Sequence, residues 1–554
     1  MNNKSLIKYF NEKNLTLSWY RILRWNDKSS KDIFGIKSFD YDFSNNIKKL
    51  SSDLISMEYV PTRPEKFFVP KSSLMQRTKT ILNIQDAIVY QAIANMVGML
   101  SYEKLGKNNN FVFGSVLCPE VKRGELILDE MGKKEINLFF FQHYAAHYKK
   151  FAKSVNQAIV RDKVVYKLET DITGFFDSIP HYCLLSELSN KFLIEDEVLD
   201  ILDNCLNMWS GTAENKTPGV GIPQSIPPSY LLANILLHEL DNTIIKTGMK
   251  YCRYMDDMRV YGYSERELIE ILLKIDTYLK SIGLSLNSKK TNIEKCDNSY
   301  NDSSIIKFFN YIEFDDSSSK DFEFFSEQDQ FAINENNIIL NDDKEIEDFW
   351  RQELDYVEEE LPKLFCVNQQ PGHSIKVDES VEDRQILNFA YKYRVALKKL
   401  CLMNVSRGPN VSILKYWISV LESRCWRSDQ ICWVLNYYKN NSELKNNLLS
   451  IYKHSPYEWV RYQVIQCLSV SQNFTSQELK ELLGFAIHDN SNYAKLSLYN
   501  LLLFHNIDDQ FFSSVYINLK NEKNIYLKKL MSYYIKLSKD KLINKNEIME
   551  IFYL

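Results

Sequence analysis

Apolar and polar positions repeat with different periods along this chain, and the period predicts which elements form. From Leu6 to Tyr59 the apolar residues recur at helical spacing, interrupted by the polar stretch NDKSSKD. The prolines of YVPTRPEKFFVPKSS and the short extended run between them then predict a strand that enters a new unit. Residues 84–100, IQDAIVYQAIANMVGML, are predicted to form a helix with an almost wholly apolar face.

The middle of the chain alternates between strand-like and helix-like segments. KVVYKLETDI is predicted to be a strand, residues 184–209 are predicted to be helical, SYLLANILLHELDNTII is a buried helix, and YCRYMDDMRVYG is a β-hairpin followed by a helix over residues 265–282. A long helix is also predicted over residues 134–159. This order is typical of an α/β sheet covered by helices.

The last part of the chain is predicted to be helical throughout. Residues 315–347 are polar and acidic, which indicates a domain boundary, and we expect domains of residues 1–325 and 326–554. Beyond this boundary, aromatic-aliphatic-basic triplets begin at Trp459, Tyr493 and Tyr526, each followed by an apolar helical run. The nearly equal intervals between the starts of these triplets are typical of an α-solenoid, and an irregular helical bundle is the alternative.

Composition narrows the class of protein without identifying a function. A chain of 554 residues exceeds the roughly 250–300 residues at which a single core stops growing. Its formal net charge of -4 gives no general attraction to nucleic acid, so such binding would require a local basic surface. No segment resembles a signal peptide or a membrane span, and the ten cysteines lack zinc or disulfide spacing. We therefore expect a cytoplasmic protein with reduced thiols that does not contact a membrane.

The segment YCRYMDDMRVYG places two like charges, Asp256 and Asp257, at the tip of an apolar ribbon. Two adjacent aspartates on their own usually mark a solvated turn. Here Met255 and Met258 bracket the pair, which indicates a packed tip where like charges repel and cations would offset them. A magnesium site for phosphoryl transfer calls for a further carboxylate from another strand, and Asp171 at the end of YKLETDI is the candidate.

The segments around these aspartates resemble, in order, the motifs of reverse transcriptases. DITGFFDSIPH, GVGIPQSIPPSYLLANILLHELD, RYMDDM, SIGLSLNSKKT and FFNYI are similar to motifs A to E of that family, and QRTKTILNIQDAIVYQAI is similar to its fingers segment, with Arg77 and Asp86 spaced as in the bacterial relatives. The resemblance covers residues 61–314. It implies α/β fingers and palm of reverse-transcriptase type, followed in this chain by an all-α, HEAT-like helical repeat domain.

The resemblance also implies a metal site and its ligands. Asp171 and Asp256 correspond to the metal-binding carboxylates of the family, Asp257 is their neighbour in the site, and the backbone carbonyl of Ile172 also faces a metal. Two Mg²⁺ ions are implied as cofactors, with Mn²⁺ as a substitute. Such metals, together with cations that hold the phosphates in line, are most of what phosphoryl transfer requires of a protein.

Four further residues correspond to the nucleotide-binding positions of the family. Arg77 would contact the triphosphate, Phe176 would lie under the sugar and block a 2′-hydroxyl, Gln224 would line the pocket, and Lys290 would lie near the leaving phosphate. The alternative for Arg77 and Lys290 is an exposed basic side chain, and the alternative for Phe176 is core packing beside Phe175. The family usually has Gly after this Gln, whereas the present chain has Ser225, which puts template handling in doubt.

The remaining alternatives concern the kind of polymerase. Viral RNA polymerases share the palm but carry a second Asp and a Gly where this chain has Phe176 and Met255, so DNA synthesis from dNTPs is favoured. The helical second half resembles the bacterial antiphage group of abortive-infection and defence-associated reverse transcriptases, rather than group II intron or retron enzymes. That group implies oligomers, and either protein-primed synthesis with DNA attached through Tyr or copying of a non-coding RNA. A non-catalytic nucleic-acid-binding module with a fossil palm is the rival from another class.

Overall fold

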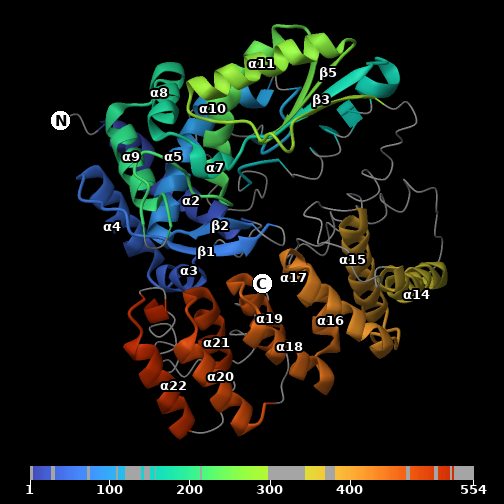
Figure 1. The fold of residues 1–554 in the computed structure, drawn as a ribbon. Coiled ribbons are helices and arrows are strands. Elements are labelled where there is room, and N and C mark those ends of the chain that lie inside the picture. Colours follow the sequence, from blue (N-terminus) through green and yellow to red (C-terminus); the bar gives the residue numbers. More distant parts are fainter. Residues whose placement is uncertain are drawn as a thin grey trace. The chain divides into compact units, whose positions relative to one another are not determined.

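The computed structural model has two compact units that are interleaved along the sequence. One contains residues 1–66 and 79–309, and the other contains residues 67–78 and 310–554 (Figure 1). The predicted boundary at residue 325, the segment FFNYI, Tyr526 and half of the predicted helix over residues 134–159 lie outside the described residues. These are residues 4–25, 31–71, 75–107, 110–118, 139–142, 147, 150–151, 153–155, 157–212, 215–296, 343–367, 381–469, 474–504, 509–524 and 527–529.

The first unit begins with helices packed around one central apolar helix; the helices are predicted from the sequence, and their packing is seen in the structure. The N-terminal helices are α1 (Lys4–Phe10), α2 (Glu12–Leu23), α3 (Ile33–Asp40) and α4 (Phe43–Ile55). Helix α5 (Ile84–Tyr102) begins after Asn83, whose side chain accepts a hydrogen bond from the backbone N–H of Gln85. It is buried along most of its length and contacts α1, α2, α8, α9 and α10, which explains why it lacks a polar face.

A four-stranded antiparallel sheet forms the second part of this unit. Its strands are β3 (Tyr166–Thr170), β4 (Lys250–Tyr254), β5 (Asp257–Gly262) and β6 (Asn292–Lys295), in the order β4-β5-β3-β6. Helices α10 (Pro227–Ile245) and α11 (Glu265–Ser281) pack against it. Leu168 and Val260, which are neighbours in the β3-β5 register, are fully buried. The predicted hairpin, strand and two flanking helices are therefore confirmed.

The helical segment predicted over residues 184–209 is interrupted. The structure has a short helix α7 (Phe175–Ser178), then α8 (His181–Phe192) and α9 (Asp196–Trp209). Between α8 and α9, Leu193 adopts a left-handed backbone conformation with φ of 55° and is exposed. An apolar residue is uncommon at such a position, so the sequence offers no turn signal there.

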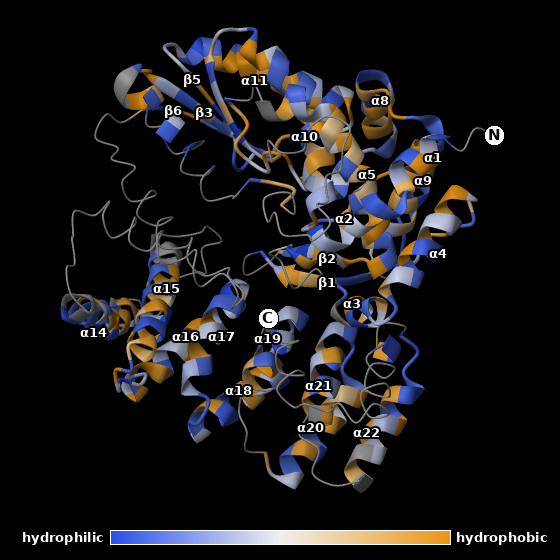
Figure 2. Cartoon of the chain, turned by 180° about the vertical axis from the view of Figure 1, so that it is seen from behind, coloured by the Kyte–Doolittle hydropathy of each residue, from blue (hydrophilic) through white to orange (hydrophobic). Residues whose placement is uncertain are grey.

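In its described residues, the second unit has no strand outside the segment of residues 67–78, and its elements are otherwise helices. Each of its helices carries both hydrophilic and hydrophobic residues, as Figure 2 shows. The helices are α14 (Asp343–Val367), α15 (Val381–Leu402), α16 (Leu414–Ser423), α17 (Ser428–Leu435), α18 (Ser442–His454), α19 (Glu458–Ser469), α20 (Ser476–His488), α21 (Asn492–Phe504) and α22 (Asp509–Asn521). The all-helical prediction is confirmed for the described residues of this half, whereas the HEAT-like classification stays a prediction.

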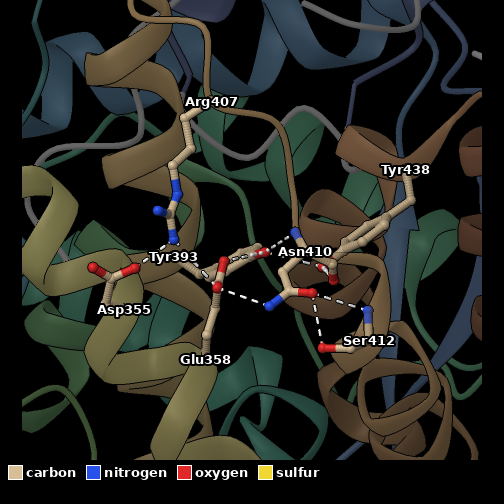
Figure 3. A network of polar contacts seen from close by, with 7 residues as sticks. All are labelled: Asp355, Glu358, Tyr393, Arg407, Asn410, Ser412 and Tyr438. Carbon is tan, nitrogen blue, oxygen red and sulfur yellow. Dashed lines mark hydrogen bonds and ion pairs between the residues drawn. The ribbon is translucent and has the colours of Figure 1, made fainter.

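A polar network joins α14 and α15 to the segment that leads into α16 (Figure 3). Asn410 donates from its side chain to Glu358 at 2.9 Å and from its backbone to the Tyr393 hydroxyl at 2.9 Å. The Tyr438 hydroxyl donates to the Asn410 carbonyl at 3.0 Å, and Arg407 pairs with Glu358 at 3.3 Å. Because Glu358 is largely buried, these partners stabilise its charge and fix the path of the segment.

Strands β1 (Glu65–Pro70) and β2 (Gln76–Ile81) form a two-stranded sheet, and residues 67–78 of it belong to the second unit. The Phe67 ring is fully buried and stacks on Tyr493 with ring centroids 4.0 Å apart, and Tyr493 stacks on Tyr462 at 4.1 Å. Trp459 lies parallel to Phe67 at 5.6 Å. Next to these rings, the Glu458 carboxylate accepts a hydrogen bond from the Phe68 backbone N–H at 2.6 Å.

Two of the three basic triplet residues form ion pairs within the second unit. Arg461 donates to Asp489 at 2.9 and 3.0 Å, and Lys495 pairs with Glu522 at 2.8 Å. The side chains of both are largely buried. The triplets therefore place cations that brace neighbouring helices, and Arg461 and Lys495 are not free to track phosphates as an exposed stripe.

Candidate active site

The end of β3 positions Asp171 at the edge of the sheet. Its residue is 8% exposed, and its backbone carbonyl accepts a hydrogen bond from the Asn287 N–H at 2.8 Å. The next residue, Ile172, is buried and forms an isolated antiparallel bridge with Leu286. The segment around residues 285–291 therefore runs beside the first aspartate and holds its backbone in place.

The β4-β5 hairpin positions the other two aspartates. Tyr254 pairs with Asp257 in the register, so Met255 and Asp256 form the two-residue turn between the strands. Met255 has φ of 57°, a left-handed conformation that two-residue hairpin turns require at their first central position and that normally favours Gly. The tip is packed, as the sequence predicts, because Met255 is 9% exposed and Met258 is fully buried.

The electrostatics of the site show that Asp171 and Asp256 lie close enough to interact. Burial and then repulsion from Asp171 raise the pKa of Asp256 from 3.8 to about 6. Lys290 opposes this rise: its ammonium lies 3.0 Å from Oδ2 of Asp171. The Asn287 side-chain amide donates to the same oxygen at 3.2 Å. The structure therefore brings together three predicted site residues, Asp171, Asp256 and Lys290.

Asp257 faces a second set of charges. Arg259 lies 3.8 Å from Asp257 and 3.4 Å from Glu169, and it stacks over the Phe151 ring. Burial raises the pKa of Asp257, and Arg259 opposes the rise. The Asp257 side chain is 48% exposed, more than that of Asp171. Asp257 is thus the adjacent carboxylate of the site, with its own cationic partner.

The carboxylates of the site can be compared with the ligands that a divalent cation needs. Within the part of the chain that the structure describes, no three His, Cys, Asp or Glu side chains are grouped so as to hold a metal ion. Mg²⁺, however, usually takes one or two carboxylates and completes its shell with water and substrate phosphates. Asp171 and Asp256, which converge from two neighbouring segments of one sheet, fit that donor set. The prediction that Asp257 and the Ile172 carbonyl join them stays a prediction.

Of the predicted nucleotide-pocket residues, Phe176 lies in the short helix α7 and Gln224 lies in the loop that leads into α10. The Phe176 ring is 7% exposed and packs edge-on against Tyr230 of α10 at 5.5 Å, and its backbone carbonyl accepts from the Ile222 N–H. Gln224 is half-buried, two residues further along the same loop. Ser225, which replaces the usual Gly, has φ of 73°, so this position keeps the backbone conformation that favours Gly. The role of Phe176 as a steric gate stays a prediction.

Arg77 is exposed on β2. It lies within residues 67–78 and therefore belongs to the second unit. Asp86, at the start of α5, is fully buried instead. It accepts hydrogen bonds from the Tyr59 hydroxyl at 2.6 Å and from the Thr62 backbone and hydroxyl at 3.0 and 2.6 Å. Burial raises the pKa of Asp86 and these hydrogen bonds oppose the rise. Asp86 therefore anchors the chain that leads into β1.

Three residues that contact the site or its turn escaped the sequence analysis: Asn287 beside Asp171, and the buried ion pair of Arg253 and Asp241 behind the turn. Asn287 has no signal of its own, since amides are common in loops. Arg253 and Asp241 did offer a signal: each is a charged residue within a mostly apolar stretch, Arg253 in a strand and Asp241 in a helix. Such interior charges are almost always paired, so the pairing could have been predicted.

The β4-β5 hairpin of this antiparallel sheet presents two aspartates beside Asp171, which follows the adjoining strand β3, and this arrangement fits the palm of a nucleotidyltransferase. Comparison with known families gives the particular type. Residues 126–326 match the family described as "Reverse transcriptase (RNA-dependent DNA polymerase)". A reverse transcriptase domain is therefore present in this chain, which confirms the resemblance at the level of the domain.

A curated relative is an uncharacterized 91 kDa protein in the cob intron of Schizosaccharomyces pombe. It is 29% identical in the matched part, which covers 24% of this chain and 24% of that protein. The chain thus spans about a quarter of the length of that relative.

Solved structures that match include apo telomerase from Candida tropicalis, with a TM-score of 0.30 and 10% identity over 89% of this chain and 69% of that chain. Telomerase from Candida albicans in complex with a TWJ fragment of telomeric RNA also has a TM-score of 0.30 and 10% identity, over 84% and 67% of the two chains. Likenesses with so low a TM-score carry no argument about this chain.

Proposed function

We propose that this chain is a DNA polymerase that adds deoxynucleotides to a hydroxyl group in a reaction that depends on Mg²⁺. The observation that supports this most is the convergence of Asp171 and Asp256 beside the Lys290 ammonium. Bound divalent metal would neutralise the triphosphate charge and activate the attacking hydroxyl. The hydroxyl oxygen forms a bond to the α-phosphorus, and the bond to the leaving pyrophosphate breaks.

The chain's own residues supply positioning and charge in this proposal. Asp171 and Asp256 hold the metal, with Asp257 and the Ile172 carbonyl at the same site. Lys290, whose side chain is half-exposed, is a mobile cation that can transfer from Asp171 to the phosphates when a nucleotide arrives.

Arg77 suits the triphosphate because its planar guanidinium binds phosphate oxygens bidentately. Phe176 and Gln224 form the sugar side of the pocket, and Phe176 excludes a 2′-hydroxyl.

The finer assignment is to bacterial antiphage defence by abortive infection. It is supported by the architecture alone, a reverse transcriptase domain followed by a helical half, and it includes action as an oligomer in the cytoplasm. Synthesis is then either protein-primed, with DNA attached through a Tyr hydroxyl, or directed by a non-coding RNA. Of the helices that the structure describes, none combines the length and apolar character needed to cross a bilayer.

The second candidate is an intron-type reverse transcriptase. The relative encoded in the cob intron of S. pombe favours it, although the match covers a quarter of each chain. The two candidates differ in their dependence on RNA and in their effect on phage. If the defence role is right, cells that carry the wild-type chain should give fewer plaques than cells with Asp256→Asn. Equal plaque counts across a broad phage panel would favour the intron-type reverse transcriptase.

The proposed chemistry is tested with purified full-length protein, Mg²⁺ and single dNTPs or NTPs, with and without co-purifying RNA. We expect incorporation of dNTPs only. Products that enter a gel after protease treatment alone indicate a protein primer, and products lost after ribonuclease pretreatment indicate an RNA template. If no nucleotide is incorporated under any of these conditions, the chain is a non-catalytic binding module and the proposal is wrong.

Asp256→Asn should abolish this incorporation without loss of stability, because it removes a metal ligand and a charge that Asp171 repels. The matched control is Asp276→Asn, which removes a partly exposed carboxylate on α11 that pairs with Lys280. The control should keep full activity. Retained synthesis in Asp256→Asn would exclude this carboxylate from the reaction.

A further inference from the structure

A buried arginine lies directly behind the turn that carries Asp256. Arg253, in β4, has 0% exposure. Its Nε and Nη2 donate to the two carboxylate oxygens of Asp241 in α10 at 2.8 and 2.6 Å. The Tyr251 hydroxyl donates to the same carboxylate at 2.8 Å. A buried ion pair of this kind often adds little to stability compared with apolar side chains of similar volume, so its retention calls for another reason.

The remaining side of the guanidinium reaches the turn itself. Nη1 of Arg253 donates to the Met255 carbonyl at 2.8 Å and to the Asn234 side-chain oxygen at 2.8 Å. Met255 is the residue before Asp256, and it is held in the left-handed region without being Gly. Such a backbone costs roughly 1–2 kcal/mol and persists only where the surroundings determine it. The Arg253 hydrogen bond is one such determinant.

The other side of the turn is fixed by Gly114. The Asn234 side chain donates to the Gly114 carbonyl at 3.0 Å, and the neighbouring Phe113 N–H donates to the Arg253 carbonyl at 2.8 Å. A Cβ on Gly114 would lie 2.7 Å from the Met255 backbone nitrogen. The turn is therefore enclosed between the Arg253 guanidinium and the backbone at Gly114, and Asn234 joins the two.

We propose that Arg253 is a positioning residue that fixes the direction of the Asp256 carboxylate through the Met255 carbonyl, and that Asp241 and Asn234 orient Arg253 for this task. The inference rests on the proposed function in so far as Asp256 acts as a metal ligand. It goes further, because it assigns the alignment of that ligand to a charge network outside the site. A purely structural ion pair would stabilise the fold without affecting the turn.

The double variant Arg253→Met/Asp241→Asn separates these two roles. It removes both buried charges together and keeps an acceptor for the Tyr251 hydroxyl, so the fold should be retained, with a melting temperature near that of the wild type. The Met255 carbonyl loses its donor. We expect faster amide exchange at residues 254–257 in the metal-free protein and Mn²⁺ binding that is about tenfold weaker by electron paramagnetic resonance. We also expect kcat to fall by about a hundredfold while the KM for dNTP changes little.

Gly114→Ala tests the opposite side of the turn without altering any charge. Its new methyl group must displace the Met255 backbone, so it should give the same exchange, Mn²⁺ and kcat effects. Gly408→Ala is the matched control, since nothing lies within 4 Å of a Cβ there.

The outcomes distinguish the inference from the proposed function. Unchanged amide exchange and Mn²⁺ affinity in a folded double variant would overturn the positioning role, even if the wild type is an active polymerase. The opposite result is also informative. If the variants change amide exchange and Mn²⁺ affinity as expected while the wild type incorporates no nucleotide, the positioning role is supported and the polymerase assignment is overturned. A double variant that fails to fold leaves Gly114→Ala to decide: a wild-type response there contradicts the inference.

Discussion

Ser225 is a residue other than Gly at a position whose backbone conformation favours Gly. Its φ of 73° lies in the region that favours Gly, and it is 9% exposed beside Gln224. Left-handed backbone costs a residue other than Gly roughly 1–2 kcal/mol, whereas Gly adds about 0.5–1 kcal/mol of unfolded-state entropy. The first effect is the larger, so the chain keeps a strained serine where glycine would be more stable.

Ser225→Gly should therefore raise the free energy of unfolding by up to about 1 kcal/mol, measured by urea denaturation. Ser186→Gly, in the middle of α8, is the control: its helical backbone gains nothing from Gly, so stability should fall by roughly 0.5 kcal/mol. A loss of stability in Ser225→Gly would mean that hydrogen bonding by the Ser225 side chain outweighs the strain.

At the scale of residues, the sequence singled out side chains that conflict with their neighbours. Asp256 and Asp257 stood out against an apolar hairpin, and Asp171 stood at the end of an alternating strand. Asn287 could not be predicted, because its role depends on a partner 116 positions away and on the local path of an irregular segment. The left-handed Met255 was equally hidden, since Met carries no turn preference.

Helix and strand identities followed from periodicity, but the junctions between them did not. The helices α5, α10 and α11 were predicted within a few residues, because long apolar faces dominate local propensity. The break between α8 and α9 was missed, because it falls at Leu193 rather than at Gly, Pro or Asn. The stack of Phe67 on Tyr493 was also out of reach, since no local pattern shows which distant surface covers a short strand.

Within the second unit, Glu458 should control the stability of the segment of residues 67–78. Its carboxylate accepts from the Phe68 N–H and from the Ser491 hydroxyl, and burial raises the pKa of Glu458. Loss of a hydrogen bond to a charged acceptor costs about 1.5–3 kcal/mol. Glu458→Ala should therefore speed exchange of the Phe68 amide by at least about tenfold, measured by hydrogen exchange and mass spectrometry.

Two control variants isolate this contact. Glu458→Gln keeps an acceptor oxygen and should exchange at a rate between those of the wild type and Glu458→Ala. Glu481→Ala removes an exposed carboxylate of the same unit that pairs with Lys453, and it should leave the amide unchanged. Equal exchange in the wild type and Glu458→Ala would show that the aromatic rings alone hold the segment.

At the scale of the whole molecule, the sequence suggests two successive domains and the contacts show interleaved units. Residues 67–78 belong with residues 310–554, although they lie between parts of the first unit. Composition could locate an acidic boundary near residues 315–347. Composition could not reveal that residues 67–78, in the first half of the chain, belong to the second unit.

A chain truncated after residue 325 should therefore expose Phe67 and self-associate. The ring is fully buried in the intact chain, and exposing a Phe side chain costs about 1.5–3 kcal/mol. Light scattering and limited proteolysis would show larger particles and cleavage within residues 67–78. Phe67→Gln in the truncated chain should restore a monomer; a truncated wild-type chain that is already monomeric and resistant to protease would contradict the expectation.

The membership of residues 67–78 in the second unit also has an evolutionary consequence. A recombination event that joined the catalytic half of this chain to the helical half of a relative would bring Phe67 against rings selected for a different partner. Chimaeras made by exchanging halves between relatives should then fold only when residues 67–78 come from the same parent as the helical half. Arg77, a nucleotide-binding candidate, would come from that parent too. We therefore expect the two halves to be inherited together rather than exchanged as separate modules.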